Sequence, residues 1–286
     1  MKPQWLKIKL SRNDNFDSID NTLKKYNLHT VCQEAHCPNI SECWNGGTAT
    51  FMIMGGICTR GCRFCAVKTG RPLMLDKDES QKLAQAVKEW GLDYIVITSV
   101  DRDDLTDQGA NHFAACIVEV RKENPNTLIE VLVPDFRGDE ELIKIIIEAM
   151  PDVFAHNIET VKRLQNVRDR RANYEQSLFV LKKAKELGIK HTKSSIMLGL
   201  GETDEEVIEA MQDMRAIDID IITFGQYLRP SQKHIQISEY VHPEKFEYYK
   251  KVAEELGFLY CASGPFVRSS YRAGEFFLKG LMKQSR

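Results

Sequence analysis

Residues 49–65 read ATFMIMGGICTRGCRFC, an apolar run that leads through two glycines into three closely spaced cysteines. The apolar part has the length and composition of a buried β-strand. The cysteines follow at positions 58, 62 and 65, in a C-x3-C-x2-C pattern. A group of free thiols at this spacing indicates metal or redox chemistry directly after a strand.

A second group of three cysteines precedes this strand. Cys32, Cys37 and Cys43 are spaced C-x4-C-x5-C, so six of the eight cysteines fall between residues 32 and 65. The first residues, MKPQWLKIKLSRND, contain no apolar segment of the kind that directs export, and disulfides are therefore not expected. The remaining two, Cys116 and Cys261, lie in apolar patterns and are expected to be buried small hydrophobic residues.

Charge and length exclude several classes of protein. The 286 residues carry 39 basic and 41 acidic side chains, a net charge of −2, whereas proteins held to nucleic acid by charge have a basic excess. The longest uncharged stretch is far shorter than the roughly 20 residues that cross a bilayer. We therefore expect a cytoplasmic protein that binds neither nucleic acid nor membrane, with one large domain or two small ones.

Ligand number favours iron–sulfur clusters over zinc. A closed structural zinc site takes four ligands, and each triplet supplies three. A [4Fe–4S] cluster held by three cysteines leaves one iron free to bind another group, so two triplets predict two clusters with different fourth ligands. The alternative is one or two zinc sites completed by His29 or His36.

The motif CTRGCRFC, with an aromatic residue before its last cysteine, resembles the radical S-adenosylmethionine (SAM) superfamily. Within it, the first triplet, CQEAHCPNISECW (32–44), and the segment RSSYRAGE (268–275) resemble the lipoyl synthase family. Further stretches resemble the same family: TSVDRDDL (98–105), PDFRGD (134–139), HNIETV (156–161), KSSIMLGLGE (193–202) and GQYLRPS (225–231).

The resemblance implies two [4Fe–4S] clusters and SAM as cofactors. It implies that Cys58, Cys62 and Cys65 hold the cluster that binds SAM, with Phe64 beside the adenine. It also implies that Cys32, Cys37 and Cys43 hold an auxiliary cluster whose fourth ligand is a serine of the RSSY motif. On the match this is Ser270, with Ser269 the alternative.

Two arginines inside the SAM motif have two interpretations. Arg60 and Arg63 either add positive charge beside the cluster or are surface residues, and the sequence does not separate the two.

Alternating strand and helix patterns predict an α/β fold. The expected strands are 49–54, 94–99, 128–133, 152–156, 191–197 and 220–224, and helices are expected at 78–90, at 173–187 and after a capping box formed by Thr203 and Glu206. Six such units predict a partial (β/α)6 TIM-type barrel, and the resemblance implies a barrel of the radical SAM kind. An open doubly wound sheet is the alternative from periodicity alone.

The predicted barrel spans 48–262. An irregular N-terminal extension, 1–47, would carry the auxiliary-cluster cysteines. A C-terminal segment, 263–286, would bring the RSSY motif back to that extension, so that the two ends of the chain meet.

Polar residues after the predicted strands are candidate SAM contacts, because barrel sites lie at the carboxyl ends of strands. Ser99, Asn157 and Glu159 are expected near the nucleoside or methionine, and ordinary strand-ending turns are the alternative. Arg170 and Lys193 are candidates for orienting a carboxylate or substrate. The basic run at 168, 170 and 171 either meets an acidic carrier domain or is a solvated helix end.

The family's reaction inserts two sulfur atoms at carbons six and eight of an octanoyl chain that is amide-linked to a carrier lysine. The resemblance implies octanoylated lipoyl carrier domains as partners, namely 2-oxoacid dehydrogenase acyltransferase subunits and the glycine cleavage H protein. Ferredoxin or flavodoxin is implied as reductant. Two other interpretations are a sulfur inserter of the biotin synthase kind, which would not need the first triplet with RSSY, and a zinc-stabilised binding module.

Overall fold

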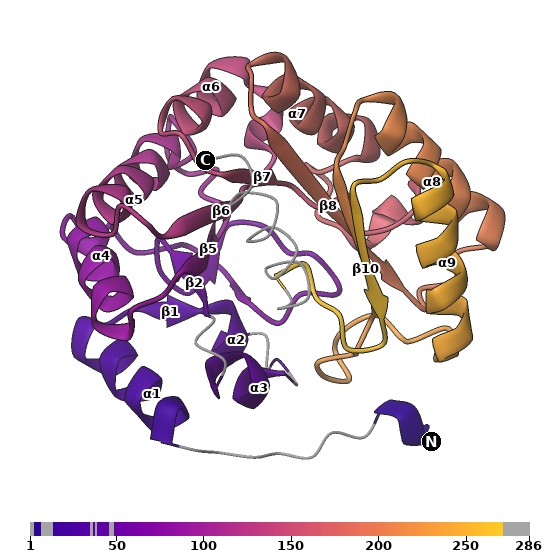
Figure 1. Ribbon diagram of the computed structural model, residues 1–286, viewed down its shortest axis with the longest axis horizontal. Coiled ribbons are helices and arrows are strands. Elements are labelled where there is room, and N and C mark those ends of the chain that lie inside the picture. Colours follow the sequence, from indigo (N-terminus) through magenta and orange to yellow (C-terminus); the bar gives the residue numbers. More distant parts are fainter. Residues whose placement is uncertain (1–2, 7–13, 35–36, 38, 46–48, 271–286) are drawn as a thin grey trace.

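The computed structural model describes residues 3–6, 14–34, 37, 39–45 and 49–270. Eight of the described strands form one curved sheet in the order β1-β2-β5-β6-β7-β8-β9-β10, with β1 and β10 at its two ends (Figure 1). Their bounds are β1 His29–Thr30, β2 Thr50–Ile53, β5 Tyr94–Ser99, β6 Leu128–Leu132, β7 Val153–Ala155, β8 His191–Leu198, β9 Ile221–Gln226 and β10 Tyr260–Gly264.

The strands from β2 to β10 are all parallel, and each of the six from β2 to β9 is followed by a helix on the outside of the ring (Figure 1). These helices are α4 Glu79–Trp90, α5 Ala110–Glu123, α6 Glu140–Glu148, α7 Tyr174–Glu186, α8 Asp204–Ala216 and α9 Pro243–Glu255. Six strand–helix units and an incomplete ring confirm the predicted partial barrel and exclude the doubly wound sheet. The parallel strand β10 adds a seventh to the six expected, and it runs two residues past the predicted boundary at 262.

Local signals place the helix ends as the sequence predicts. Gly91 ends α4 in the left-handed conformation with φ 59°, which glycine adopts without strain. Thr203 and Glu206 form the expected capping box at the start of α8, and Asn173 caps α7 by accepting from the Gln176 amide at 2.8 Å.

Alternation along each strand divides the core into two parts. Ile95 and Ile97 face the helices and join the main buried cluster with Leu83 and Val87 of α4. Tyr94 faces the inside of the ring, in a second cluster that also contains Val96, Leu128, Val153 and Ile221. Because these residues lie at the first half of their strands, they fill the amino-terminal half of the ring.

The N-terminal extension is more regular than predicted. Helix α1, Asp14–Tyr26, has thirteen residues, and Ile19 and Leu23 place an apolar stripe of it into the main core. Strand β1 then pairs antiparallel with β2, and the short helices α2, Val31–Glu34, and α3, Ile40–Asn45, follow. None of the helices in the described ranges combines the length and apolar character that a bilayer crossing requires.

Candidate active site

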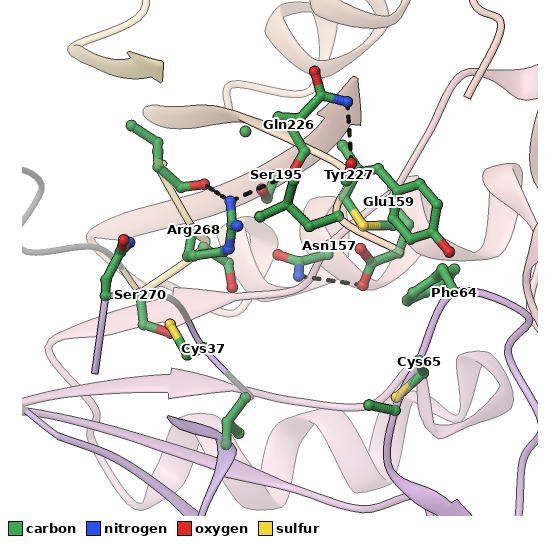
Figure 2. A pocket seen from close by; sticks show the side chains of 18 of the residues that line it. Cys37, Phe64, Cys65, Asn157, Glu159, Ser195, Gln226, Tyr227, Arg268 and Ser270 are labelled. Atoms are coloured by element: carbon green, nitrogen blue, oxygen red, sulfur yellow. Dashed lines mark hydrogen bonds between the residues drawn. The ribbon is translucent and has the colours of Figure 1, made fainter. Parts of the chain in front are cut away.

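One cavity of about 430 Å³ opens at the carboxyl ends of the strands, above the filled half of the ring. Residues from both ends of the chain and from the barrel line it. Figure 2 shows Cys37 and Ser270 on one side, Phe64 and Cys65 on the other, and Asn157 between them. The cavity therefore joins the two cysteine groups, which are separate in the sequence.

The first triplet lies in and between the short helices α2 and α3. Cys32 and Cys43 are buried and Cys37 is partly buried, and all three line the cavity. Ser269 and Ser270 line the same cavity, although more than 220 residues separate them from Cys43. Nearby, the Asn39 side-chain amide donates to the carbonyl of Phe266 at 2.5 Å. This contact holds the C-terminal segment against the segment that carries the first triplet.

The second triplet lies on the loop that begins at β3, Ile57–Cys58, and returns through β4, Lys68–Thr69. Backbone amides point at two of its sulfurs. Cys58 Sγ accepts from the amides of Arg60 (3.4 Å) and Asp101 (3.3 Å), and Cys62 Sγ accepts from the amide of Asp169 (3.2 Å). Amide donors to sulfur are among the features that tune iron–sulfur clusters, so the donor set fits such a group.

Burial governs the protonation of these thiols. It raises the pKa of Cys58 and of Cys62 to about 12, and that of Cys32 to about 11. In the absence of iron the thiols are therefore neutral at pH 7. Binding of a cluster must release their protons, as for any thiolate site.

Of the two histidines that the zinc alternative names, His29 lies among the described residues. Among the described residues, no three His, Cys, Asp or Glu side chains come close enough together to hold a single ion. His29, one candidate fourth ligand, has its Nδ1 atom 3.3 Å from Glu34 Oε1. His36, the other candidate, lies outside the described residues.

Of the three candidate SAM contacts that follow strands, two line the cavity and one does not. Asn157 and Glu159 line the cavity, where the Asn157 amide donates to Glu159 Oε1 at 3.2 Å. Glu159 has a left-handed backbone with φ 68°, held by hydrogen bonds to Ser195 O and from Met197 N, and burial raises its pKa. Ser99 is not among the residues that line the cavity; it is partly buried at the end of β5, and its enclosed hydroxyl has no hydrogen-bond partner among the described residues.

Two other candidates do not line the cavity. Lys193 is 3% exposed inside the ring, where its ammonium lies 2.8 Å from Glu130 Oε1. The Tyr94 hydroxyl also donates to Glu130, so the lysine belongs to a polar group in the filled half of the ring. Arg170 is exposed.

The three arginines of the basic run at 168–171 differ in exposure. Arg168 is buried and donates to Ser177 Oγ at 2.8 Å, and Arg171, with a side chain 34% exposed, pairs with Asp169 at 2.7 Å. Arg170 is exposed. Arg168 therefore belongs to the interior, and a basic surface at this place would consist of Arg170 and Arg171.

Sequence reasoning missed a set of carboxylates around the cysteine loop. Asp103, Asp135 and Asp169 all follow strands at the carboxyl edge and all contact the loop or its neighbours. Each of these aspartates follows a predicted strand, and that position alone predicts a side chain near the cysteine loop at the carboxyl edge of the barrel. Arg268 was also missed; it lines the cavity beside Cys37 and donates to the carbonyl of Val267 at 2.7 Å (Figure 2).

Two family models match the chain. That of the radical SAM superfamily covers residues 52–214, and that of the N-terminal domain of lipoyl synthase covers residues 1–37. Between them they include both cysteine groups, apart from Cys43.

Full-length relatives extend the match. The lipoyl synthase of Halobacterium salinarum is 55% identical over 100% of this chain and 94% of its own length. That of Myxococcus xanthus is 55% identical over 100% and 96%, and the mitochondrial lipoyl synthase of Schizosaccharomyces pombe is 55% identical over 99% and 78%.

Solved structures share the fold at low identity. Methylornithine synthase (PylB) aligns with a TM-score of 0.59 over 89% of this chain and 79% of its own, at 14% identity. Streptococcus suis SuiB bound to its precursor peptide SuiA gives 0.61 over 90% and 56%, at 15% identity. The relatives, the family models and the partial barrel agree, and the chain belongs to the lipoyl synthase family of the radical SAM superfamily.

Proposed function

We propose that this chain forms the lipoyl group by inserting two sulfur atoms at carbons six and eight of a protein-bound octanoyl-lysine. It is a radical SAM sulfurtransferase that works with SAM and [4Fe–4S] clusters. The observation that carries the proposal is the single cavity lined by Cys65 and by Cys32, Cys37 and Cys43. Sulfur insertion requires a radical source and a sulfur source to reach the same alkyl chain, and this cavity can bring them together.

Each cysteine group is assigned one cluster in this proposal. Cys58, Cys62 and Cys65 hold the cluster that binds SAM, and Cys32, Cys37 and Cys43 hold the auxiliary cluster. When bound, these groups supply what side chains lack: an electron to cleave SAM, and sulfide to form the C–S bonds. General acid–base groups could not replace them, because acid–base catalysis contributes only about 10²–10⁴-fold and the two carbons are unactivated.

Ser270 is the proposed fourth ligand of the auxiliary cluster, with Ser269 the alternative. Both line the cavity wall that carries the first triplet, which supports the assignment. A serine oxygen is a harder ligand than a thiolate, and iron–sulfur clusters prefer soft ligands. As a ligand, Ser270 would therefore bind iron more weakly than the three thiolates, and it would be the ligand best suited to dissociate.

The remaining cavity residues orient SAM and exclude water. Phe64 is proposed to stack beside the adenine, and Asn157 and Glu159 to bind the nucleoside or the methionine. Ser99, outside the cavity lining, is proposed as a further contact because its buried hydroxyl has no partner in the part of the chain that the structure describes. Apolar side chains make up much of the lining, among them Val31, Ile196, Met197 and Leu228. Such a wall keeps water away from a reactive carbon centre.

Arg170 and Lys193 are the weakest members of the proposed site. Lys193 already has a carboxylate partner, and neither residue lines the cavity. We retain them as candidate orienting groups for a carboxylate or substrate that reaches beyond the cavity.

The proposed organisation has three parts: an extension, 1–47; the barrel, 48–262 with the end of β10; and a C-terminal segment that carries RSSY. Lipoyl carrier proteins are the substrates of the family. We propose the 2-oxoacid dehydrogenase acyltransferase subunits and the glycine cleavage H protein as carriers, ferredoxin or flavodoxin as reductant, and the cytoplasm as location.

Anaerobic reconstitution tests the proposal. We expect about eight iron and eight sulfide per chain. With SAM, a reductant and an octanoylated H protein, mass spectrometry should detect the lipoyl-lysine peptide. Zinc without sulfide would instead support a binding module, and conversion of a free small molecule but not the carrier would support a biotin synthase-like activity.

A further inference from the structure

The three residues between Cys58 and Cys62 are each held by a loop at the carboxyl edge of the barrel. The Thr59 amide donates to Asp101 O at 3.1 Å, and its hydroxyl lies 2.9 Å from Asp103 Oδ2. The Gly61 amide donates to Asp169 Oδ2 at 2.9 Å. Between them, Arg60 makes the most contacts.

The Arg60 side chain lies in a cluster of carboxylates, in which Asp101 Oδ1 is 3.3 Å from its Nε atom and Asp101 Oδ2 is 3.5 Å from Cys58 Sγ. Its Nε and Nη2 atoms donate to Asp103 at 2.9 and 3.0 Å, and its Nη1 and Nη2 atoms donate to Asp135 at 2.7 and 2.8 Å. Asp103 lies in the loop after β5 and Asp135 in the loop after β6. One planar guanidinium therefore joins the cysteine loop to two neighbouring strand ends by paired hydrogen bonds, the strongest kind available to arginine.

Further contacts fix the carboxylates themselves. Asp103 also accepts from Arg137 Nε at 2.8 Å, and Asp135 accepts from the Arg137 amide at 3.0 Å. The orientation of the cluster therefore does not depend on Arg60 alone. Removing the guanidinium would leave both carboxylates buried beside the loop and lacking their main partner.

Arg63, in the same motif, provides the contrast. Its side chain is exposed, whereas Arg60 is 5% exposed. Arg60 lies two positions from Cys58 and from Cys62, and Arg63 follows Cys62 directly, so both are near the thiols in the sequence. They differ in burial and in the hydrogen bonds of their side chains.

We propose that Arg60 is a positioning residue that sets the direction in which Cys58 and Cys62 present their sulfurs. The inference rests on the proposed function for the identity of the group that the loop holds. A lysine at this position keeps the charge but cannot make paired contacts to two carboxylates at once. Displacement of a reacting group by about 1 Å can cost on the order of 100-fold in rate.

The test compares Arg60→Lys with Arg63→Lys as matched control. Both proteins are reconstituted anaerobically, and iron content, the EPR spectrum of the reduced protein with and without SAM, and the rate of 5′-deoxyadenosine formation are measured. For Arg60→Lys we expect an altered EPR spectrum in the presence of SAM and a rate lowered by roughly 10- to 100-fold. For Arg63→Lys we expect values within about twofold of the unchanged protein, since exposed side chains contribute little.

A measurement without any cluster isolates the effect on the loop. Hydrogen exchange of the apoprotein should be faster at residues 59–63 in Arg60→Lys and unchanged in Arg63→Lys. Asp103→Asn should reproduce the EPR change, and the double variant with Arg60→Lys should lose less than the sum of the two single losses, because both substitutions remove the Arg60–Asp103 contact.

Three results would overturn the proposal: an unchanged spectrum and exchange pattern, additive losses in the double variant, or losses that accompany a lower melting temperature and faster exchange throughout the chain. None of these readouts requires lipoyl product. Failure of the proposed reaction would therefore appear separately, as normal SAM cleavage and a normal EPR response without sulfur insertion.

Discussion

The C-x3-C-x2-C loop and the N-terminal cysteine segment reach the same cavity from different surroundings. The loop is held by directed polar contacts, including amide donors to Cys58 and Cys62 and the carboxylates around Arg60. Apolar packing contributes more to the N-terminal segment, where Cys32, Cys43 and Trp44 lie inside the main hydrophobic cluster, beside hydrogen bonds such as that from the Gln33 side-chain amide to Asp20.

This difference matches the tasks proposed for the two sites. Directed hydrogen bonds specify orientation, which a cluster that must bind SAM in one geometry needs. Apolar packing fixes where the first cysteine group lies but restrains the direction of its side chains less. The fourth ligand proposed for the auxiliary cluster, Ser270, comes from the C-terminal segment. The sites should therefore fail in different ways when their surroundings are altered.

The largest expected effect comes from removing one cysteine of each group. Cys58→Ala should abolish 5′-deoxyadenosine formation, because its cluster loses a ligand next to SAM. Cys37→Ala should retain SAM cleavage and abolish lipoyl formation. Both products are quantified by mass spectrometry from the same reaction, and lipoyl product from the Cys37 variant would contradict the assignment of the sulfur donor.

Ser270→Cys should give the next largest effect. A thiolate suits iron better than a serine oxygen, so the iron content should stay close to that of the unchanged protein while sulfur insertion falls at least about tenfold. Ser269→Cys is the matched control and should affect insertion less. Normal lipoyl formation by the Ser270 variant would remove the role of a labile ligand.

Trp44→Ala tests the packing around the first group. Trp44 is fully buried next to Cys43, and truncation of a buried tryptophan costs about 3–5 kcal/mol of unfolding free energy. We expect loss of the auxiliary cluster before the SAM cluster, measured as iron content alongside 5′-deoxyadenosine formation. Trp5→Ala, at a side chain 38% exposed, is the control, and equal loss of both clusters in the Trp44 variant would contradict the separation.

The smallest effect is expected for Thr59→Val, which removes one hydroxyl from the loop at nearly constant volume. Its contact with the charged Asp103 carboxylate should be worth about 2 kcal/mol, with a several-fold lower rate of SAM cleavage and an intact auxiliary cluster. Denaturant unfolding and the 5′-deoxyadenosine assay measure the two quantities. A change in auxiliary iron content would show that the two regions are coupled.

Much of the fold could be predicted because its signals are local. The six strands, the glycine that ends α4 and the capping box of α8 depend on residues a few positions apart. The regular helix α1 was missed because it lies in a segment rich in polar residues, where two apolar side chains were enough to anchor it. The seventh parallel strand, β10, was not among the predicted strands, and the sequence marks its region only by the apolar pattern around Cys261.

Cysteine spacing and motif order were sufficient to identify the family, and they predict the two ligand groups, because both depend on residues that lie close together in the sequence. Spacing could not separate Arg60 from Arg63, nor reveal that Lys193 pairs with Glu130 and Arg168 with Ser177. The partner of each basic side chain depends on which carboxylates and hydroxyls the barrel brings together from loops that are distant in the sequence. Burial makes such a partner necessary, because a buried charge requires one and a solvated charge does not.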